Sequence, residues 1–296
     1  MFDGRPLLRT GNYLYGDDIG HDACGIGGVA ARDGKSSHEV LKKTVLALKN
    51  VEHRGGLCGE AGDGAGLICQ VPQAFFKEEA KKLRLDQARY LKPEDRVAVG
   101  VVFFPEAGRD PARAVIRDVL AKGPVHWLGW RPVPTRDDVL PDLARKTRPQ
   151  IEQLLLRVEG DADAAEAFLY RARLEMRHRF RQAGLDVYVP ILSARLVGYK
   201  GLLTSHQFAD FYPDLADPAF ETGLALFHRR YSTNTYPNWS LGQPFRYSCH
   251  NGEINTIRTN RNAVHAYSRG LSPPLPGGDL LTPKMSDSAS LDEWLD

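Results

Sequence analysis

Apolar residues recur with two different periods along this chain, and the two periods predict both strands and helices. Short runs of apolar, β-branched and aromatic residues, such as 97–104, are typical of buried strands. Between 40 and 51, apolar residues instead return every three or four positions, as on one side of an amphipathic helix. Ser36 and Glu39 fit a capping box at the start of that helix, and the glycines at 55–56 should end it.

The same two patterns divide the rest of the chain into elements. Strands are predicted at 24–31, 65–71, 97–104, 125–133, 150–158, 187–204 (two strands joined by a turn), 222–233 and 245–252. Helices are predicted at 73–85, 110–122, 161–181 and 253–268. Many strands follow one another directly, which favours a layered fold with a substantial antiparallel component over a regular βαβ repeat.

The two ends of the chain differ from the middle. Residues 1–22 are polar and glycine-rich without clear periodicity, so we expect a leader segment there. At the other end, the sequence stops inside what reads as the start of a helix, and we therefore expect a truncated fragment.

Composition and charge narrow the classes of function. Lys and Arg number 39 while Asp and Glu number 37, which leaves a net charge of +2. A balance this close gives no electrostatic reason to expect a nucleic acid or a membrane surface as a partner. No apolar run approaches the roughly 18 residues of a membrane span, and the N-terminus lacks the apolar core of a signal peptide. We therefore expect a cytoplasmic protein.

The four cysteines, Cys24, Cys58, Cys69 and Cys249, form no C-x-x-C pair. Zinc ribbons and thioredoxin-like redox motifs thus lack their usual signal. Without a secretory signal, we expect the thiols to stay reduced. A metal site built from Cys58, Cys69 and His53 would have a spacing that fits no common site.

Residues 25–30 match G-x-G-x-x-A, which alone is a weak signal for dinucleotide binding. The context argues against that function, because the fingerprint should follow a strand and open a helix. The alternative is a tightly packed strand whose glycines admit a neighbouring backbone.

Cys24 is a sharper candidate, because it opens a strand at the end of the expected leader. If the chain were cut between Ala23 and Cys24, the thiol would share a residue with a free α-amine. Such an amine has a reference pKa of about 7.7–8.0, so it can accept the thiol proton near neutral pH. His53 or His250 could instead act as the base, as in papain-like enzymes. The alternative to any catalytic role is a small buried hydrophobic residue.

Three polar motifs could complete a site around such a nucleophile. Arg54 stands at the end of a helix beside a glycine-rich loop and could hold a carboxylate, although a helix cap and a solvated loop explain it equally. The arginines at 229–230 end an apolar strand, where they are either a carboxylate-binding fork or a surface pair. Asn251 and Gly252 offer the two donors of an oxyanion hole, whereas Asn251 alone could be a helix N-cap.

Taken together, these segments resemble the N-terminal class II glutamine amidotransferase domain of glutamate synthase large subunits, in the N-terminal-nucleophile hydrolase superfamily. The segments are, in order, CGIGGVA at 24–30, EHRG at 52–55, GDGAG at 62–66, RRYSTNTYPNW at 229–239, QPFRYSCHNGEINT at 243–256 and SDSASLD at 286–292. The resemblance runs from 24 to 296. It implies an α+β fold, a four-layer αββα sandwich of two antiparallel sheets that is incomplete at its C-terminus.

The resemblance also implies roles for individual residues. Cys24 looks like the catalytic nucleophile, exposed by removal of the leader 1–23. Arg54 matches the arginine that lies against the nucleophile, and Gly55 follows it as in the family. Asn251 and Gly252 resemble the oxyanion hole.

Two further positions resemble the residues that hold the substrate glutamine. Arg230 looks like the arginine that binds the α-carboxylate, and Asp287 like the acid that receives the α-amino group. The implied reaction is hydrolysis of glutamine to glutamate and ammonia, with the ammonia passed to 2-oxoglutarate in the full enzyme.

The family's FMN and iron–sulfur cluster would lie in the remainder of the full-length enzyme, so we expect no cofactor in this chain. The expected partners are glutamine and the remainder of the synthase, and the resemblance also allows for a small reductase subunit. Two alternatives stay open: a separate amidotransferase subunit that feeds ammonia to another chain, and a non-catalytic glutamine-binding or assembly domain in which Cys24 is never unmasked.

Overall fold

The computed structural model describes residues 25–58, 61–230, 238–250, 252–283 and 285–295. Within these residues the strands form two four-stranded antiparallel sheets and a short ribbon. The first sheet contains, in spatial order, β1 (Gly25–Ala30), β10 (Leu224–Arg229), β4 (Ala65–Gln70) and β9 (Leu196–Gly201). The second contains β6 (Val125–Pro132), β7 (Gln150–Val158), β5 (Val97–Phe104) and β8 (Tyr188–Ser193). The ribbon pairs β2 (Leu57–Cys58) with β3 (Ala61–Gly62).

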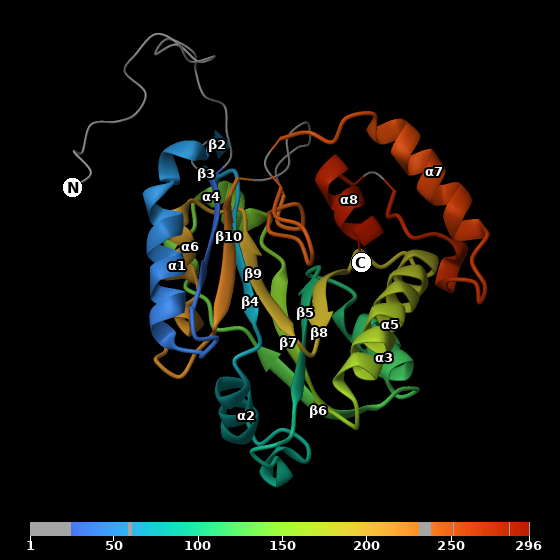
Figure 1. The fold of residues 1–296 in the computed structure, drawn as a ribbon, viewed down its shortest axis with the longest axis horizontal. Helices are drawn as coiled ribbons and strands as arrows, with labels where there is room; N and C mark the ends of the chain where they lie inside the picture. The colour runs from blue at the N-terminus through green and yellow to red at the C-terminus, as the bar shows by residue number, and fades with distance from the viewer. Residues whose placement is uncertain (1–24, 59–60, 231–237, 251, 284, 296) are drawn as a thin grey trace.

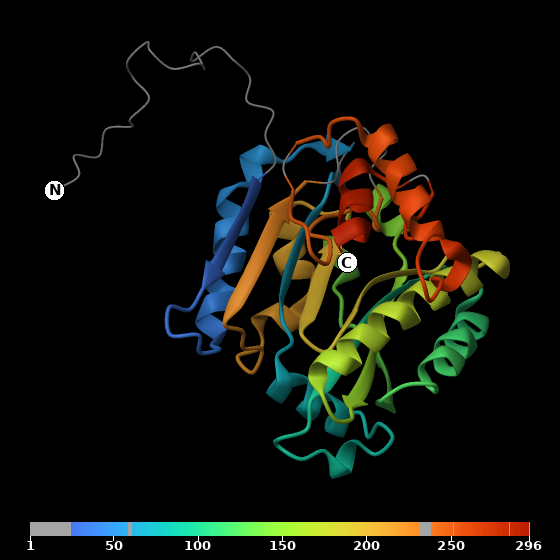
Figure 2. The same ribbon diagram turned by 45° about the vertical axis from the view of Figure 1, so that its right-hand side comes forward.

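Helices flank the two sheets on opposite sides. The main helices are α1 (His38–Asn50), α2 (Gln73–Lys82), α3 (Arg109–Leu120), α4 (Asp142–Lys146), α5 (Ala162–Gln182), α6 (Ser205–Phe211), α7 (Ile257–Arg269) and α8 (Asp287–Leu295). Across Figure 1 the order is α1 with α6, the first sheet, the second sheet, and α5 with α3. The expected α+β fold with αββα layering is therefore confirmed. Turned by 45°, the same ribbon shows α7 and α8 lying above α5 (Figure 2).

The period-2 pattern of β5 explains how the second sheet joins two parts of the core. All eight residues of β5 are buried. Val97, Val99 and Val101 belong to a core that also takes in the first sheet and α1. Val102 and Phe104 belong instead to the core under α3 and α5. Because successive strand residues face opposite sides, one apolar run supplies both layers.

Most predicted elements are confirmed, and two strands match residue for residue, β5 at 97–104 and β7 at 150–158. The pair predicted within 187–204 is also present as β8 and β9, but the two strands lie in different sheets, since β8 pairs with β5 and β9 with β4. Their short connection therefore links the sheets rather than closing a hairpin within one.

The predicted capping box at Ser36 and Glu39 is wrong. The N-cap of α1 is Ser37, whose side chain makes no capping hydrogen bond. Its backbone is instead engaged by Thr222, with Ser37 N donating to Thr222 O over 3.1 Å and Thr222 N donating back over 3.3 Å. A long-range backbone bridge thus fixes the start of this helix.

The strand predicted at 245–252 is also wrong, and the helix expected from 253 starts only at Ile257. Asp292 explains the missing strand, because its Oδ1 accepts hydrogen bonds from the backbone N–H groups of Tyr247 (2.7 Å) and Ser248 (2.9 Å). These donors are therefore taken by a side chain of α8 instead of a neighbouring strand. The left-handed backbone of Thr256 (φ 53°) separates α7 from the preceding loop.

The G-x-G-x-x-A segment lies entirely inside β1, so it neither follows a strand nor opens a helix. A Cβ atom on Gly27 would come within 2.6 Å of the Phe227 ring on β10. The glycine thus serves close packing between two strands, as the alternative interpretation proposed, although it admits a side-chain ring rather than a backbone. Among the helices of the described residues, none combines the length and apolar character that crossing a membrane would require.

Candidate active site

Cys24 and Asn251, together with the leader 1–23, lie outside the described residues. The site is therefore built from the residues beside them. Gly25, which follows Cys24, opens β1 and pairs with Arg229 on β10. A Cβ atom on Gly25 would lie 3.3 Å from the Cβ of Arg54. The glycine thus lets the segment that carries Arg54 approach the start of β1.

Position 55 also requires a glycine, in this case because the buried guanidinium group of Arg229 lies directly against it. After α1 ends at Asn50, a 3₁₀ turn spans Glu52–Arg54 and Gly55 follows in an extended conformation. A Cβ atom on Gly55 would fall 2.0 Å from Cζ of Arg229. Any larger residue would therefore collide with the guanidinium group.

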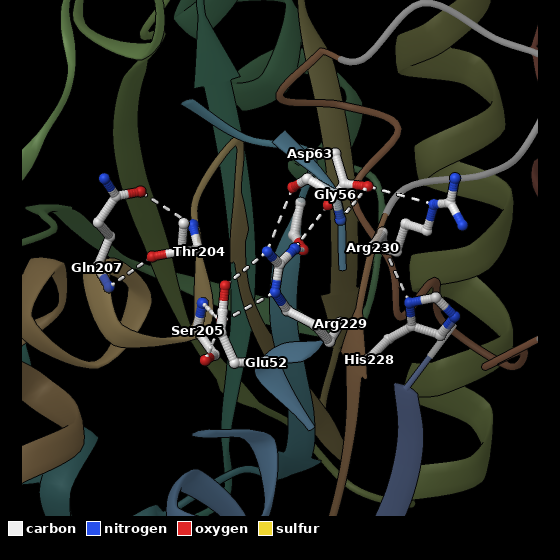
Figure 3. A network of polar contacts seen from close by, with 10 residues as sticks. Glu52, Gly56, Asp63, Thr204, Ser205, Gln207, His228, Arg229 and Arg230 are labelled. Atoms are coloured by element: carbon white, nitrogen blue, oxygen red, sulfur yellow. Dashed lines mark hydrogen bonds and ion pairs between the residues drawn. The ribbon is translucent and has the colours of Figure 1, made fainter. Parts of the chain in front are cut away.

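Arg229 is the hub of a polar network at this end of the first sheet (Figure 3). It is 1% exposed. Its guanidinium donates to both carboxylate oxygens of Glu52, over 3.0 and 2.8 Å, and to Oδ1 of Asp63 over 2.6 Å. It also donates to the carbonyl oxygens of Gly64 (2.9 Å) and Gly56 (3.3 Å). We call these five residues the Arg229 network. It holds the EHRG turn and the GDGAG loop together.

Glu52 also reaches a second segment of the chain. Its Oε2 accepts hydrogen bonds from the backbone N–H of Ser205 (2.7 Å) and from the Ser205 hydroxyl. Burial on its own would raise the pKa of Glu52, but the hydrogen bonds from Arg229 and Ser205 outweigh it, and the pKa is lowered. Glu52 is therefore a carboxylate at neutral pH, as its partners require.

Arg230 follows the last residue of β10 and has an unusual backbone. Its φ is +122°, a region that residues other than glycine rarely adopt. Its N–H donates to the carbonyl oxygen of Gly64 over 2.8 Å. Its Nε lies 3.2 Å from Oδ2 of Asp63, and the side chain is 26% exposed. Figure 3 shows the tip of the guanidinium turned away from Asp63, so its two terminal nitrogens face away from the Arg229 network.

The segment before Asn251 is held by hydrogen bonds between the Gln243 side chain and the backbone of His250. The Gln243 side chain accepts from the N–H of His250 over 3.0 Å and donates to its carbonyl oxygen over 3.1 Å. Beyond Asn251, Gly252 has a φ of +113° and is exposed. The backbone N–H of Ile254 then donates to Oδ2 of Asp287 over 2.7 Å. Asp287 at the start of α8 is thus tied to the chain that carries Gly252.

One imidazole joins the two halves of the site. His228 is fully buried, and its Nδ1 lies 2.9 Å from the carbonyl oxygen of Arg230. Its Nε2 lies 3.0 Å from the carbonyl oxygen of His250. Arg54 and Gly55 therefore gather at the start of β1 with the Arg229 network, and His228 connects that end of β10 to the segment that leads to Gly252 and Asp287.

Sequence reasoning assigned no role to His228, Gln243, Glu52 or Asp63. For Arg229 it offered a carboxylate-binding fork or one of a surface pair, and the surface interpretation is wrong because the side chain is buried among Glu52 and Asp63. Glu52 and Asp63 stand inside the EHRG and GDGAG segments, so the motifs themselves could have drawn attention to them. Nothing local distinguishes Arg229 from Arg230, and nothing local pairs Gln243 with His250. The contacts of Arg229 depend on Glu52 and Asp63, which are far away in the sequence. Gln243 and His250 are only seven positions apart, and the conformation of the loop between them brings them together.

The other candidate residues have ordinary surroundings. His53 is exposed, and Nδ1 of His250 lies 3.4 Å from the Ser288 hydroxyl. Cys69 is buried in β4, and burial raises the pKa of its thiol to about 12. A thiol with that pKa is neither a nucleophile nor a metal ligand at neutral pH. In the described part of the chain, no group of three or more His, Cys, Asp or Glu residues is placed to hold a metal ion.

Comparisons with known proteins show which family the chain belongs to. The family model of class-II glutamine amidotransferases matches residues 24–296. Over 96% of its length, the chain is 40% identical to the glutamate synthase [NADPH] large chain of Azospirillum brasilense, of which it covers 19%. It is 38% identical to the corresponding chain of Bacillus subtilis, with 94% of this chain and 19% of the relative covered.

A plant relative extends the comparison. The chloroplastic ferredoxin-dependent glutamate synthase of Oryza sativa is 38% identical, with 91% of this chain and 17% of the relative covered. The chain thus spans about a fifth of the length of these relatives. On the family match and these identities together, the chain belongs to the class-II glutamine amidotransferases.

Proposed function

We propose that this chain is the glutamine-hydrolysing domain of a glutamate synthase, and that the ammonia it releases converts 2-oxoglutarate into a second glutamate elsewhere in the full-length enzyme. The observation that carries the proposal is the pairing of Gly25 with Arg229. It brings the residue that follows Cys24 beside the residue that precedes Arg230. A nucleophile and a carboxylate-binding arginine must lie within the length of one glutamine if both are to engage it, and this pairing supports such a placement.

The proposed chemistry begins with removal of Met1–Ala23, which frees the α-amine of Cys24. The amine accepts the thiol proton, and the thiolate attacks the side-chain carbonyl carbon of glutamine. The amine then returns the proton to the leaving nitrogen, and ammonia departs. Water attacks the resulting thioester and releases glutamate, which restores the thiol.

The remaining site residues stabilise the charge that forms during the reaction and hold the substrate glutamine in position. The side-chain amide of Asn251 and the backbone N–H of Gly252 donate to the oxyanion that forms in each tetrahedral intermediate. Arg230 binds the α-carboxylate of glutamine through its terminal nitrogens. Asp287 receives the α-amino group.

The flavin and the iron–sulfur cluster of the family belong, in this proposal, to the part of the enzyme outside this chain. A cytoplasmic location, expected from the sequence, and a reductase partner, implied by the family resemblance, are further parts of the proposal.

The first test is the state and the function of Cys24 in the full-length protein. Intact mass should show a chain that begins at Cys24. Cys24→Ser should sharply reduce glutamine hydrolysis, because a neutral hydroxyl is a poorer nucleophile than a thiolate. A purified, active protein that still carries Met1–Ala23, or undiminished activity of the serine variant, would contradict the proposal. An unprocessed and inactive protein would favour the binding-domain alternative.

Steady-state glutaminase kinetics then separate the two kinds of site residue. Removing one oxyanion donor typically costs about 2.7–4 kcal/mol in the barrier, so Asn251→Ala should lower kcat roughly a hundred- to a thousandfold with little change in KM. Arg230→Ala should mainly raise KM, because the α-carboxylate keeps its charge during amide cleavage. The reverse pattern would show that the roles are assigned wrongly.

A further inference from the structure

His228 faces two backbone carbonyl groups and no other polar partner among the described residues. The Nδ1–O distance to Arg230 is 2.9 Å and the Nε2–O distance to His250 is 3.0 Å. One carbonyl belongs to the proposed carboxylate-binding residue. The other belongs to the residue that directly precedes Asn251. A single side chain thus touches both the substrate-binding and the oxyanion-stabilising segments.

A neutral imidazole has only one N–H, so it can donate to only one of these oxygens. Burial lowers the pKa of His228 to about 4, although the two carbonyl groups oppose this, and the ring is therefore neutral at pH 7. The carbonyl of His250 already accepts a hydrogen bond from Gln243 over 3.1 Å. In the described part of the chain, the carbonyl of Arg230 has His228 alone. The proton therefore belongs on Nδ1, where it satisfies Arg230.

The backbone of Arg230 needs this support. A φ of +122° in a residue with a side chain costs of the order of 1–3 kcal/mol and persists only where the surroundings hold it. Gly64 holds the N–H of Arg230 over 2.8 Å, and His228 holds its carbonyl over 2.9 Å. Without the second contact, the peptide after Arg230 could rotate toward a commoner conformation and turn the side chain away.

We propose that His228 is a positioning residue of glutamine hydrolysis, whose Nδ1–H holds Arg230 in the conformation that binds the glutamine carboxylate. The inference rests on the proposed function, and it adds a residue that touches neither substrate nor nucleophile. The opposite edge of the ring packs against the carbonyl of His250, so the same side chain sets the spacing between Arg230 and the segment that carries Asn251 and Gly252.

Three substitutions of His228 in the full-length, processed protein test this assignment. The amide nitrogen of asparagine falls near the place of Nδ1, and that of glutamine near the place of Nε2. His228→Asn should therefore keep KM for glutamine within about threefold of the wild type. His228→Gln and His228→Leu should raise KM by about tenfold or more, the effect of losing one hydrogen bond that orients a charged group. In both, kcat should fall by a smaller factor than KM rises.

The melting temperature of each variant is measured beside the kinetics. Equal kinetics for the asparagine, glutamine and leucine variants would overturn the proposal. So would rescue by glutamine rather than asparagine, or a loss confined to kcat. If His228→Leu does not fold, the comparison of KM between His228→Asn and His228→Gln still tests the proposal. Glutaminase activity that survives Cys24→Ala would overturn the proposed function itself, whatever the His228 variants do.

Discussion

Two arginines of this protein are buried to the same degree and yet support different kinds of structure. Arg131 on β6 and Arg229 on β10 are each 1% exposed, and each contacts two carboxylates. Arg131 donates to Glu79 over 3.0 and 2.8 Å and to both oxygens of Asp214 over 2.8 Å. In chemistry and number of bonds, this arrangement is close to that of Arg229.

The partners differ in where they lie. Glu79 is on α2, and Asp214 is in a 3₁₀ helix, Pro213–Ala216. Gln153 on β7 accepts from Arg131 over 2.7 Å and donates to the Tyr199 hydroxyl over 3.0 Å. We call these five residues the Arg131 network. Every one of them stands on a helix or strand that has its own backbone hydrogen bonds.

Among the partners of Arg229, Glu52 is also in a 3₁₀ turn, but Gly56, Asp63 and Gly64 lie outside helices and strands. Gly56 and Gly64 belong to glycine-containing turns, and Gly64 has a φ of +138°. Such segments have many accessible conformations, and side-chain contacts must select one. Arg131 therefore adds stability to elements that are already formed, whereas Arg229 gives the loops around the proposed site their shape. A buried arginine that pairs with two carboxylates can thus have a structural role at one position and a positioning role at another.

The largest expected effect is on stability, from Arg131→Met. Removing one partner of a buried ion pair typically costs about 3–5 kcal/mol, and here the carboxylate of Asp214 is left buried without its cation, whereas Glu79 keeps Lys82 at 3.0 Å. We expect that loss in the free energy of unfolding measured with urea. The folded fraction should retain kcat/KM for glutamine within about twofold. A fall in kcat/KM comparable to that of an Arg229 variant would break the comparison.

A smaller stability effect with a larger kinetic one is expected from Arg229→Met. The side chain of Glu52 is 31% exposed and can recover water, and the buried Asp63 keeps Nε of Arg230 at 3.2 Å, so the free energy of unfolding should fall by about 1–3 kcal/mol. Displacement of the EHRG turn by about 1 Å can cost about a hundredfold in rate, and kcat/KM should fall by roughly that factor.

Lysine at each position is the matched control for both methionine variants. Arg229→Lys and Arg131→Lys keep the charge but lose the planar fork. If Arg229→Lys restored full activity, charge rather than the geometry of the fork would be what the loops need. If Arg131→Lys lost activity, the Arg131 network would not be purely structural.

The smallest expected effect is a pH dependence of stability at Glu52. Its folded-state pKa is lowered below the ordinary value of 4.5, so it binds fewer protons when folded. Its contribution to stability is therefore present above pH 4.5 and is lost as the pH falls through the folded-state pKa. The difference in unfolding free energy between wild type and Glu52→Gln should be largest at neutral pH and should shrink in acid.

Glu79 supplies the matched control, because its pKa is also lowered, by Lys82 and Arg131 against the effect of burial. Glu79→Gln should show the same trend in stability with pH. It should leave kcat/KM unchanged, whereas Glu52→Gln should lower it. Identical kinetics for the two variants would remove the distinction between the networks.

The sequence by itself determined the elements whose identity depends on near neighbours. The continuous apolar run at 97–104 specified β5, and 150–158 specified β7, to the residue. The αββα class followed from a resemblance carried by six short segments, and the family comparison agrees with it. Periodicity and motifs are local properties, so a linear pattern is enough to read them.

Only the tertiary structure decided which of two adjacent arginines is buried and which reaches outward. His228 and Arg229 are successive strand residues that face opposite sides, so His228 meets the carbonyl of His250 while Arg229 meets Glu52 and Asp63. Arg230 also contacts Asp63, but only through Nε, and its side chain is 26% exposed. The strand predicted at 245–252 is wrong for a similar reason, because Asp292 on α8 accepts the hydrogen bonds of two of its backbone N–H groups. Such outcomes depend on hydrogen bonds between residues that are 22 or more positions apart, and the pattern of polar and apolar residues near one position carries no record of them.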